Sequence, residues 1–427
     1  MVLSLISIFT ALLFITGTPI LLIIAGWAIA ASYFVIDFPL ANIGVGATDS
    51  ITSFVFLAVP LFVATGDFLT EGGISQKLVA FARSLVRPLP GATTCSAIVA
   101  SGMFAAVSGS NSATAATMGR MLGPEMAGTG MPTSRAAAIV AAAGTVGVII
   151  PPSVIFIVYG ITLNVSSTDL FSGGILPGIL MVLMMLVVGS FLSRKYEPSG
   201  GLKSLKLSDI SRAAAGAWLG FLAIGVIFYG VFGGLFSPTE AAGVVTIFTC
   251  LAGLFITRKI KMRNLASIMM RSAAITGMIV PLVGFSVLFQ QVLAQLGASQ
   301  ALQELLASVG QSYGQFSVLV VMMLLILLVG AFTESVAVVL ILAPMLAPVA
   351  LNLGFDPVHW GVIFVVGASI GFITPPYGLN LFVVSAVCKV PFGHVIKSIW
   401  SMIFTLLIAW ICVAVFPWLS LAFIPSR

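Results

Sequence analysis

The chain has 427 residues, of which 60% are hydrophobic and only 7% are charged. A water-soluble core cannot absorb that much apolar surface, so the composition excludes a soluble globular protein and indicates a polytopic membrane protein. The net charge of +6 is concentrated in a few loops, where it indicates orientation in a membrane and not affinity for nucleic acid. The four cysteines lie in apolar stretches without metal-ligand spacing and are interpreted as buried free thiols. They are Cys95, Cys250, Cys388 and Cys412.

Ten hydrophobic stretches are predicted to cross the membrane, five in each half of the chain. In chain order they are 2–16, 18–36, 51–70, 133–160, 174–193, 214–235, 238–257, 272–293, 359–387 and 395–423. Residues 1–35 lack the basic start of a signal peptide and run on into further spans, so they are interpreted as part of the mature structure.

Between the third and fourth crossing of each half lies an apolar stretch that divides into two short pieces. The two stretches are 91–128 and 314–352, and each piece is expected to have about 15 residues. At about 1.5 Å per residue, such a piece is too short to cover a hydrocarbon core of about 30 Å. We therefore expect two re-entrant helical hairpins, with their tips at 108–112 and 330–335.

Two proline-proline breaks indicate that the chain contains an internal duplication. Residues 147–152 read Gly-Val-Ile-Ile-Pro-Pro, and residues 371–376, which lie 224 positions later, read Gly-Phe-Ile-Thr-Pro-Pro. The same offset pairs further identical residues: Met121 with Met345, Leu122 with Leu346, Pro124 with Pro348, Gly130 with Gly354, and Ile139 with Ile363.

Each proline-proline break is expected to free a backbone carbonyl, because proline has no N–H to donate. Pro151 should free the carbonyl of Gly147, and Pro375 should free that of Gly371. Free carbonyls at membrane depth are tolerated where they line a cavity or hold a ligand. Matching interrupted helices in two halves are typical of the binding site of a transporter.

The distribution of basic residues predicts that the two copies have opposite orientations in the membrane. Five crossings are an odd number, so the second copy enters from the other face. The stretch 73–87 carries three basic residues, whereas its partner 297–311 carries none; 160–173 carries none, whereas 388–397 carries two. With the loop 194–212 in the cytoplasm, the positive-inside bias places both termini outside.

Each hairpin tip is expected to face the broken helix of its own repeat and to form an oxygen-only cage suited to Na⁺. Hydroxyl and carbonyl oxygens suffice for a monovalent ion, so Na⁺ is predicted as the coupling ion and no other cofactor is predicted. The candidate ligands of the first site are Ser108, Ser110, Gly147, Ile150 and Pro152. Those of the second site are Gly330, Thr333, Gly371, Thr374 and Pro376.

The half-helices that begin at the tips are natural partners for an anionic substrate, because a helix N-terminus offers free N–H groups and a positive dipole end. Glu334 lies at the second tip, where an ionisable group is usually functional. It is expected to contact substrate hydroxyls or to tune the second ion site; the alternative is a cap for the following half-helix. The candidate substrate-binding residues are Asn111, Ser112, Ser153, Glu334, Ser335 and Asn380.

Some of these residues, and the chain as a whole, also have other interpretations. The first tip, Ser-Gly-Ser-Asn-Ser, also suits a close helix contact of small residues, although the repeated proline-proline break favours a site. Ser237 to Glu240 reads as a capping box with proline at the first helical position. His359 and His394 lie far apart in sequence and do not indicate a metal or catalytic pair. A channel would need a continuous polar path, and an enzyme would need a nucleophile with a base or a metal set.

Three stretches resemble signature sequences of the large membrane subunit of tripartite ATP-independent periplasmic (TRAP) transporters. They are 106–114 (AVSGSNSAT), 142–153 (AAGTVGVIIPPS) and 374–380 (TPPYGLN), and the similarity extends over essentially the whole chain. It implies an all-α, elevator-type, Na⁺-driven importer of organic acids in the bacterial inner membrane. Sialic acid is the favoured substrate, with C4-dicarboxylates or keto acids as alternatives.

The resemblance also implies two partners, a small four-helix membrane subunit and a periplasmic substrate-binding protein. This chain begins directly at the large subunit, so a separate small subunit is implied. A stand-alone ion-coupled organic-anion carrier of similar fold is the alternative.

The resemblance further implies a division into scaffold and transport elements, with the amphipathic helices at 73–87 and 297–311 bracing one against the other. The expected parts are 1–90 (scaffold and arm helix of repeat 1), 91–193 (transport elements of repeat 1), 194–213 (cytoplasmic linker), 214–313 (scaffold and arm helix of repeat 2) and 314–427 (transport elements of repeat 2).

Overall fold

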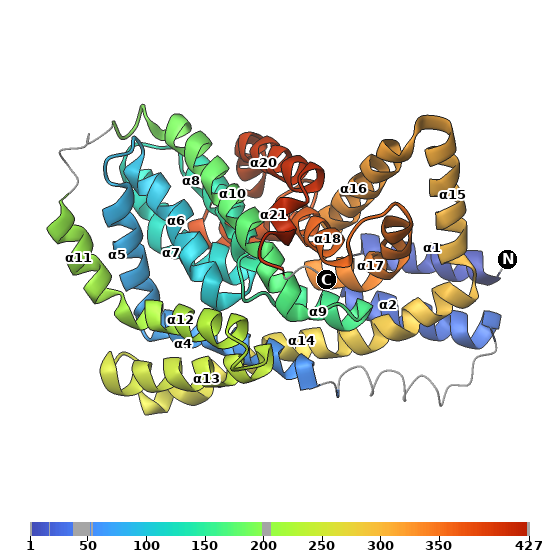
Figure 1. Ribbon diagram of the computed structural model, residues 1–427, viewed down its shortest axis with the longest axis horizontal. Helices are drawn as coiled ribbons and strands as arrows, with labels where there is room; N and C mark the ends of the chain where they lie inside the picture. Colours follow the sequence, from blue (N-terminus) through green and yellow to red (C-terminus); the bar gives the residue numbers. More distant parts are fainter. Residues whose placement is uncertain (1, 17, 37–51, 53, 199–205, 425–427) are drawn as a thin grey trace.

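The computed structural model describes residues 2–16, 18–36, 52, 54–198 and 206–424, and every secondary-structure element in these ranges is a helix (Figure 1). Within these described ranges, seven helices are long and apolar enough to cross a membrane, or eight if one bent pair counts as a single span. The all-α membrane fold predicted from the sequence is therefore confirmed. Parts of the expected scaffold and linker, 37–51 and 199–205 among them, lie outside the described residues.

The first repeat is a series of helices that includes the hairpin of α6 and α7 and the broken helix of α8 and α9. Its elements are α1 (Val2–Ile15), α2 (Ile20–Ala31) continued by η1 (Ser32–Ile36), η2 (Phe54–Leu57) continued by α4 (Ala58–Glu71), α5 (Ile74–Val86), α6 (Ala92–Ser108), α7 (Asn111–Gly128), α8 (Thr133–Gly144) continued by η3 (Thr145–Val148), α9 (Val154–Leu163) and α10 (Ser167–Ser193).

From α12 to α20, the second repeat has the same order of elements, with α11 before it and the short α21 after it. They are α11 (Leu207–Gly216), α12 (Trp218–Phe232), α13 (Pro238–Leu251) continued by η5 (Ala252–Ile256), α14 (Met262–Gln295), α15 (Ala298–Tyr313), α16 (Gln315–Phe332), α17 (Ser335–Asn352), α18 (Pro357–Gly371), α19 (Leu379–Cys388), α20 (Phe392–Val415) and the short α21 (Trp418–Leu421). Helices α11 and α12 form the bent pair, with an angle of 68° between them.

The helix boundaries repeat with the offset found in the sequence. Helices α7 and α17 have the same length and begin and end 224 positions apart, and α4 and α14 end with the same offset. Gly73 and Gly297, which precede α5 and α15, share a left-handed conformation with φ of 73° and 72°. Both Pro–Pro bonds, 151–152 and 375–376, are cis. After the break the offset rises to 225, because α9 begins at 154 and α19 at 379.

The two predicted hairpins are present, but their arms are longer than expected. Helices α6, α7, α16 and α17 have 17 or 18 residues each instead of about 15. An arm of 18 residues extends over about 27 Å, nearly the thickness of the hydrocarbon core. The expected length was wrong because the tips are very short, so almost all residues of each stretch are helical. The described helices of the first two crossings are shorter than a full span, because their apolar stretches are only Val2–Leu13 and Leu21–Ile36.

Local sequence signals explain where several helices begin. The predicted capping box is confirmed: Glu240 N–H donates to Ser237 Oγ at 3.3 Å, and Ser237 N–H donates to Glu240 Oε2 at 2.8 Å. Asp356 Oδ1 accepts from the N–H of Val358 at 2.8 Å, with Pro357 at the first helical position of α18. Such caps satisfy N–H groups that have no partner within the helix.

The helices form two groups that meet along α4 and α14. Helix α4 packs against α13 and α14, and α14 packs against α2; these helices lie along one edge of the molecule (Figure 1). The hairpins, the broken helices, α10 and α20 form the other group. Helices α5 and α15, the predicted amphipathic arms, stand at opposite ends of the view.

The repeats interlock through the second halves of the broken helices. Helix α9 packs against α17 of the second hairpin, and α19 packs against α7 of the first hairpin. Each hairpin is therefore held by a half-helix from the other repeat, so both tips are brought to the same region.

The cysteines are free, as predicted, but only one of them is fully buried. Cys95 is buried, whereas the other three are partly exposed on the surface of the described chain. An apolar neighbourhood in sequence does not distinguish burial within protein from exposure to lipid.

Candidate functional site

The tip of the first hairpin touches the break of its own repeat, as predicted. Helix α6 ends at Ser108, Gly109 adopts a left-handed conformation with φ of 62°, and Ser110 caps α7. The N–H of Val154 donates to the carbonyl of Gly109 at 3.4 Å. A Cβ added to Gly109 would lie 2.9 Å from the carbonyl oxygen of Pro152, so the close approach requires glycine.

The tip of the second hairpin makes an equally close contact with the second break. A Cβ added to Gly371 would lie 2.6 Å from the carbonyl carbon and 2.7 Å from the Cα of Gly330. The N–H of Gly378 donates to the carbonyl of Ala331 at 3.2 Å. The prediction that each tip faces its own broken helix is therefore confirmed for both repeats.

The expected free carbonyl at Gly371 is absent. The N–H of Thr374 donates to that oxygen at 2.9 Å, because the chain tightens into a turn before Pro375 and brings an earlier donor into reach. This part of the prediction was wrong.

The first break differs from the second in this respect. The N–H groups of Ile149 and Ile150 both donate to Val146 O, at 3.0 and 3.1 Å, and so neither is used on the carbonyl of Gly147.

Three of the five residues proposed for the first ion site, Ser108, Ser110 and Gly147, lie around Thr114, which was not among the predicted ligands. The hydroxyl of Thr114 donates to Ser110 O at 2.8 Å and lies 3.1 Å from Ser108 Oγ. A Cβ on Gly147 would lie 2.5 Å from Ser110 O and 2.9 Å from Thr114 Oγ1. Thr114 is one helical turn after the capping serine, and this spacing could have identified it.

The other candidate ligands of the first repeat occupy different places. The carbonyl of Pro152 faces the tip, as its closeness to Gly109 shows. The side chain of Ile150 packs towards α10, where a Cβ on Gly178 would lie 2.5 Å from its Cγ1.

The hydroxyls proposed for the second ion site are engaged within their own helices. Thr333 Oγ1 donates to Val329 O at 3.0 Å, and Thr374 Oγ1 donates to Ile370 O at 2.9 Å. Each hydroxyl proton therefore points away along its helix, and the oxygen lone pairs remain available to a cation. Pro376, the last candidate, is exposed.

A single small cavity lies where the two tips meet the α4 and α14 helices. The first tip contributes Ser110 and Asn111, the second contributes Glu334 and Ser335, and α14 contributes Ile279 to its wall. The cavity measures about 70 Å³, which is small beside the roughly 300–1,000 Å³ of typical small-molecule sites. Both hairpins therefore reach one point, on the boundary between the two helix groups.

Two equivalent polar side chains in this cavity have no hydrogen-bond partner among the described residues. Asn111 is the first residue of α7 and Ser335 is the first residue of α17, 224 positions later. They are only 2% and 1% exposed, yet both amide atoms of Asn111 and the hydroxyl of Ser335 are unpaired among the described residues. Buried polar atoms without partners are rare, and they are expected where a ligand supplies the missing bonds.

Glu334 occupies the N-cap position of α17 but makes no side-chain cap bond. Its counterpart Ser110 does cap α7, accepting from Ala113 N–H at 3.4 Å. The capping alternative for Glu334 is therefore wrong for this geometry, and the carboxylate is left to line the cavity.

Two further candidates lie away from the cavity lining. Ser153 caps α9, accepting from Phe156 N–H at 3.1 Å and donating to Val148 O at 2.6 Å. Asn380 Nδ2 donates to Ala141 O at 3.3 Å and so joins the second break to α8 of the first repeat, while its Oδ1 stays unpaired among the described residues.

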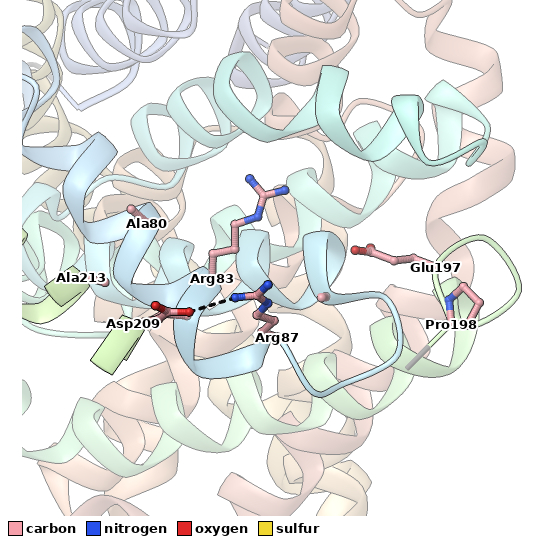
Figure 2. A pocket seen from close by; sticks show the side chains of 9 residues that line it. Ala80, Arg83, Arg87, Glu197, Pro198, Asp209 and Ala213 are labelled. Carbon is pink, nitrogen blue, oxygen red and sulfur yellow. Dashed lines mark hydrogen bonds and ion pairs between the residues drawn. The ribbon is translucent and has the colours of Figure 1, made fainter. Parts of the chain in front are cut away.

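A larger hollow of about 550 Å³ lies between α5, α6 and α11 (Figure 2). The charged side chains that line it have partners: Arg83 pairs with Glu125 at 2.9 Å, Arg87 pairs with Asp209 at 3.2 Å, and the Glu197 carboxylate accepts from Thr93 N–H at 2.9 Å. Arg87 is also more than half exposed. Among the described residues that line this hollow, no buried side chain is without a hydrogen-bond partner, in contrast to the smaller cavity.

Two hairpins and two broken helices that meet at one cavity, with buried polar side chains in its wall, are features typical of secondary transporters. The family model described as "Tripartite ATP-independent periplasmic transporter, DctM component" matches residues 6–419. The chain belongs to this family, which confirms the resemblance found in the sequence. It is a multi-pass permease subunit of the inner membrane and not an enzyme.

The names of similar proteins state different substrates. The chain is 35% identical over 369 residues to the C4-dicarboxylate TRAP transporter large permease protein DctM of Pseudomonas aeruginosa, covering 86% of both chains. It is 32% identical over 371 residues to the sialic acid TRAP transporter large permease protein SiaM of Vibrio cholerae, covering 87% of this chain and 86% of the relative. It is 33% identical to the isethionate TRAP transporter permease protein DctMQ of Oleidesulfovibrio alaskensis, of which it covers 62%.

Solved structures support the fold alone. The YdaH transporter of Alcanivorax borkumensis matches with a TM-score of 0.59 at 17% identity, covering 90% of this chain and 89% of that one. MtrF of Neisseria gonorrhoeae matches with a TM-score of 0.59 at 16% identity, covering 96% and 94%.

Proposed function

We propose that this chain is the membrane component of a Na⁺-driven importer for a small organic acid, and that the acid binds between the two hairpin tips. The observation that carries the proposal is the unpaired state of Asn111 and Ser335 in one cavity. An anionic group there would accept bonds from both side chains and would face the N-terminal ends of α7 and α17. Such helix ends favour negative charge.

The oxygens beside the first tip support the proposed coupling to Na⁺. Ser108, Ser110 and Thr114 present hydroxyl and carbonyl oxygens to one another without a carboxylate. Ser110 also lines the cavity. An ion held by these oxygens would fix the tip that holds the substrate, and binding of the ion and of the acid would then favour each other.

Movement of the hairpins against the scaffold follows from the size and place of the cavity. An organic acid needs more room than about 70 Å³, and α14 forms part of the wall. Loading therefore requires the tips to separate from α4 and α14. We assign this movement to the elevator type, with α4, α13 and α14 as the fixed part.

The named relatives supply the candidate substrates. Their names carry C4-dicarboxylate, sialic acid and isethionate. Of these, sialic acid is the substrate that the sequence resemblance favours, and keto acids are a further candidate. Glu334, whose carboxylate lines the cavity, suits an acid that also carries hydroxyl groups.

Members of this family work with a small membrane subunit and a periplasmic binding protein. We propose that this chain needs both, the small subunit as a separate chain. A docked binding protein delivers substrate at high effective concentration to a weak membrane site.

Uptake into proteoliposomes with an inward Na⁺ gradient tests the proposal. Sialic acid, a C4-dicarboxylate, a keto acid and isethionate are added singly, with and without the small subunit and the binding protein. Uptake of one acid should require Na⁺ and both partners. Equal uptake driven by a proton gradient without Na⁺ would reject the coupling ion. Saturable uptake at low concentration by the chain alone would instead favour a stand-alone carrier.

A further inference from the structure

A side chain of the scaffold helix α14 completes the backbone hydrogen bonding of the second hairpin. Pro344 lies inside α17 and has no N–H, so the carbonyl of Leu340, four residues earlier, loses its helical donor. Gln290 Nε2 donates to that carbonyl at 2.7 Å. The bond crosses the boundary between the two helix groups, and Leu340 itself is fully buried.

The bond lies close to the substrate cavity. Leu340 is five residues beyond Ser335, which corresponds to about 7.5 Å along α17. Gln290 is eleven residues beyond Ile279 on α14, and eleven residues are close to three whole turns, so both residues lie on nearly the same side of that helix. Ser335 and Ile279 both line the cavity. The bond therefore joins two helices that both contribute residues to the cavity wall.

The first repeat lacks both halves of this arrangement. The position equivalent to Gln290, by the offset of 224, is Gly66, which packs against the first tip: a Cβ added there would lie 3.3 Å from Ser108 Cβ. The position equivalent to Pro344 is Arg120, whose N–H can donate within α7. The proline and the glutamine occur together in one repeat and are absent together from the other.

We infer that Gln290 is a positioning residue that favours the described position of the second hairpin during transport. In this position the Leu340 carbonyl has a donor. When α17 slides along α14, the amide can no longer reach, and α17 has no N–H of its own to replace it. A buried carbonyl that loses its partner is unfavourable. The Gln290 bond therefore shifts the equilibrium between the two ends of the movement, and the inference rests on the proposed elevator movement.

A double-mutant cycle of Gln290 and Pro344 tests this inference, because the two effects should not be additive. Gln290→Leu removes the donor in the described position only, so the population should shift towards the other position by about 5- to 150-fold. Pro344→Ala gives Leu340 O a helical donor in every position, which removes the same preference. After that change Gln290→Leu should have almost no further effect.

The measurement is the distance distribution between two spin labels in the complex of this chain with its small subunit in liposomes. Phe236→Cys on the scaffold side and Leu351→Cys at the end of α17 supply the labels, because both residues are exposed, at 37% and 46%. The four native cysteines are replaced beforehand. Gln291→Leu is the matched control, since it changes an exposed glutamine of the same helix.

Each outcome has one meaning. Shifts in the same direction for both single variants, with the double variant matching Pro344→Ala, support the inference. Additive shifts, or no shift with Gln290→Leu, overturn it. If Pro344→Ala does not fold, Gln290→Met removes the amide donor at similar length, and an unchanged distribution in this variant overturns it. A single distance in the unchanged protein under all Na⁺ and substrate conditions rejects the movement itself, and hence the proposed function.

Discussion

Replacing Asn111 by leucine should weaken substrate binding without lowering the stability of the fold. Asn111 is 2% exposed and neither of its amide atoms has a partner among the described residues. A buried polar group without a partner costs about 1–3 kcal/mol, and leucine has a similar size without that penalty. The substrate-free protein should therefore be as stable as before, or more stable.

Substrate binding should respond in the opposite direction. If the amide donates to the anionic group of the acid, its loss removes a hydrogen bond to a charged partner, worth about 1.5–3 kcal/mol. The KM for uptake should then rise about 10- to 150-fold. Substrate should raise the unfolding temperature of the unchanged protein, because binding stabilises the folded state, but it should do so much less for the variant.

Uptake kinetics and thermal unfolding in detergent, with and without the acid, measure the two effects. Asn352→Leu is the matched control: Asn352 is an exposed asparagine at the end of α17, and its replacement should leave KM unchanged. A variant of Asn111 that is less stable without substrate and has an unchanged KM would show that the amide is structural. The assignment of the cavity as the substrate site would then lose its main support.

Three further predictions concern the ions, the tips and the topology. Ser108→Ala and Thr374→Ala should each raise the Na⁺ concentration for half-maximal uptake by about 5- to 150-fold, because each removes one oxygen ligand. Gly371→Ala should lower the free energy of unfolding by about 1–3 kcal/mol, since its Cβ would lie 2.6 Å from the carbonyl carbon of Gly330. In intact cells, a cysteine at Lys77 should react only from the cytoplasm and one at Gln303 only from outside.

Each of these predictions has a clear contrary result. An unchanged Na⁺ dependence in both hydroxyl variants would disprove the ion assignments. Gly393→Ala is the control for the tip contact, because a Cβ at Gly393 of α20 meets no atom within 4 Å; equal effects at both glycines would show that helix propensity, and not the contact, is measured. Labelling of both cysteines from one side would disprove the inverted repeat.

Because the chain contains a duplication, its paired hairpins and broken helices could be predicted from one sequence. Because a repeat aligns the chain with itself, the two proline-proline breaks and their common offset predicted the paired hairpins and broken helices. The boundaries of α7 and α17 later matched that offset at both ends. Asn111 and Ser335 were predicted for a different reason, because a half-helix was expected to begin at each tip and to favour an anionic substrate. Both residues line the cavity.

What the sequence could not supply is the contact between residues that are distant along the chain. The packing of α9 on α17 and the bond from Asn380 to Ala141 join different repeats, and no local pattern encodes them. The bond from Gln290 to Leu340 O likewise requires the position of one helix against another. The missing free carbonyl at Gly371 has a different cause, since a tight turn replaced the donor that proline removed.

Glu334 gives the last and most specific test of the site. It stands at the N-cap of α17 without a cap bond, and it lines the cavity beside Ser335. Glu334→Gln keeps the shape but removes the charge, and a hydrogen bond to a charged acceptor exceeds a neutral one by roughly 1 kcal/mol. If the carboxylate accepts from a substrate hydroxyl, KM for the acid should rise about fivefold, while thermal stability and the Na⁺ dependence stay the same.

The three readouts separate the possible roles of this carboxylate. A change in the Na⁺ dependence with an unchanged KM would assign Glu334 to the second ion site. A loss of thermal stability without substrate would assign it to the helix, against the geometry of the cap. Because its counterpart Ser110 does cap α7, the repeats differ at their tips while agreeing in their helices. A substrate that lies across the cavity therefore meets a neutral hydroxyl at one tip and a carboxylate at the other, which is how a symmetric frame can hold an asymmetric acid in one orientation.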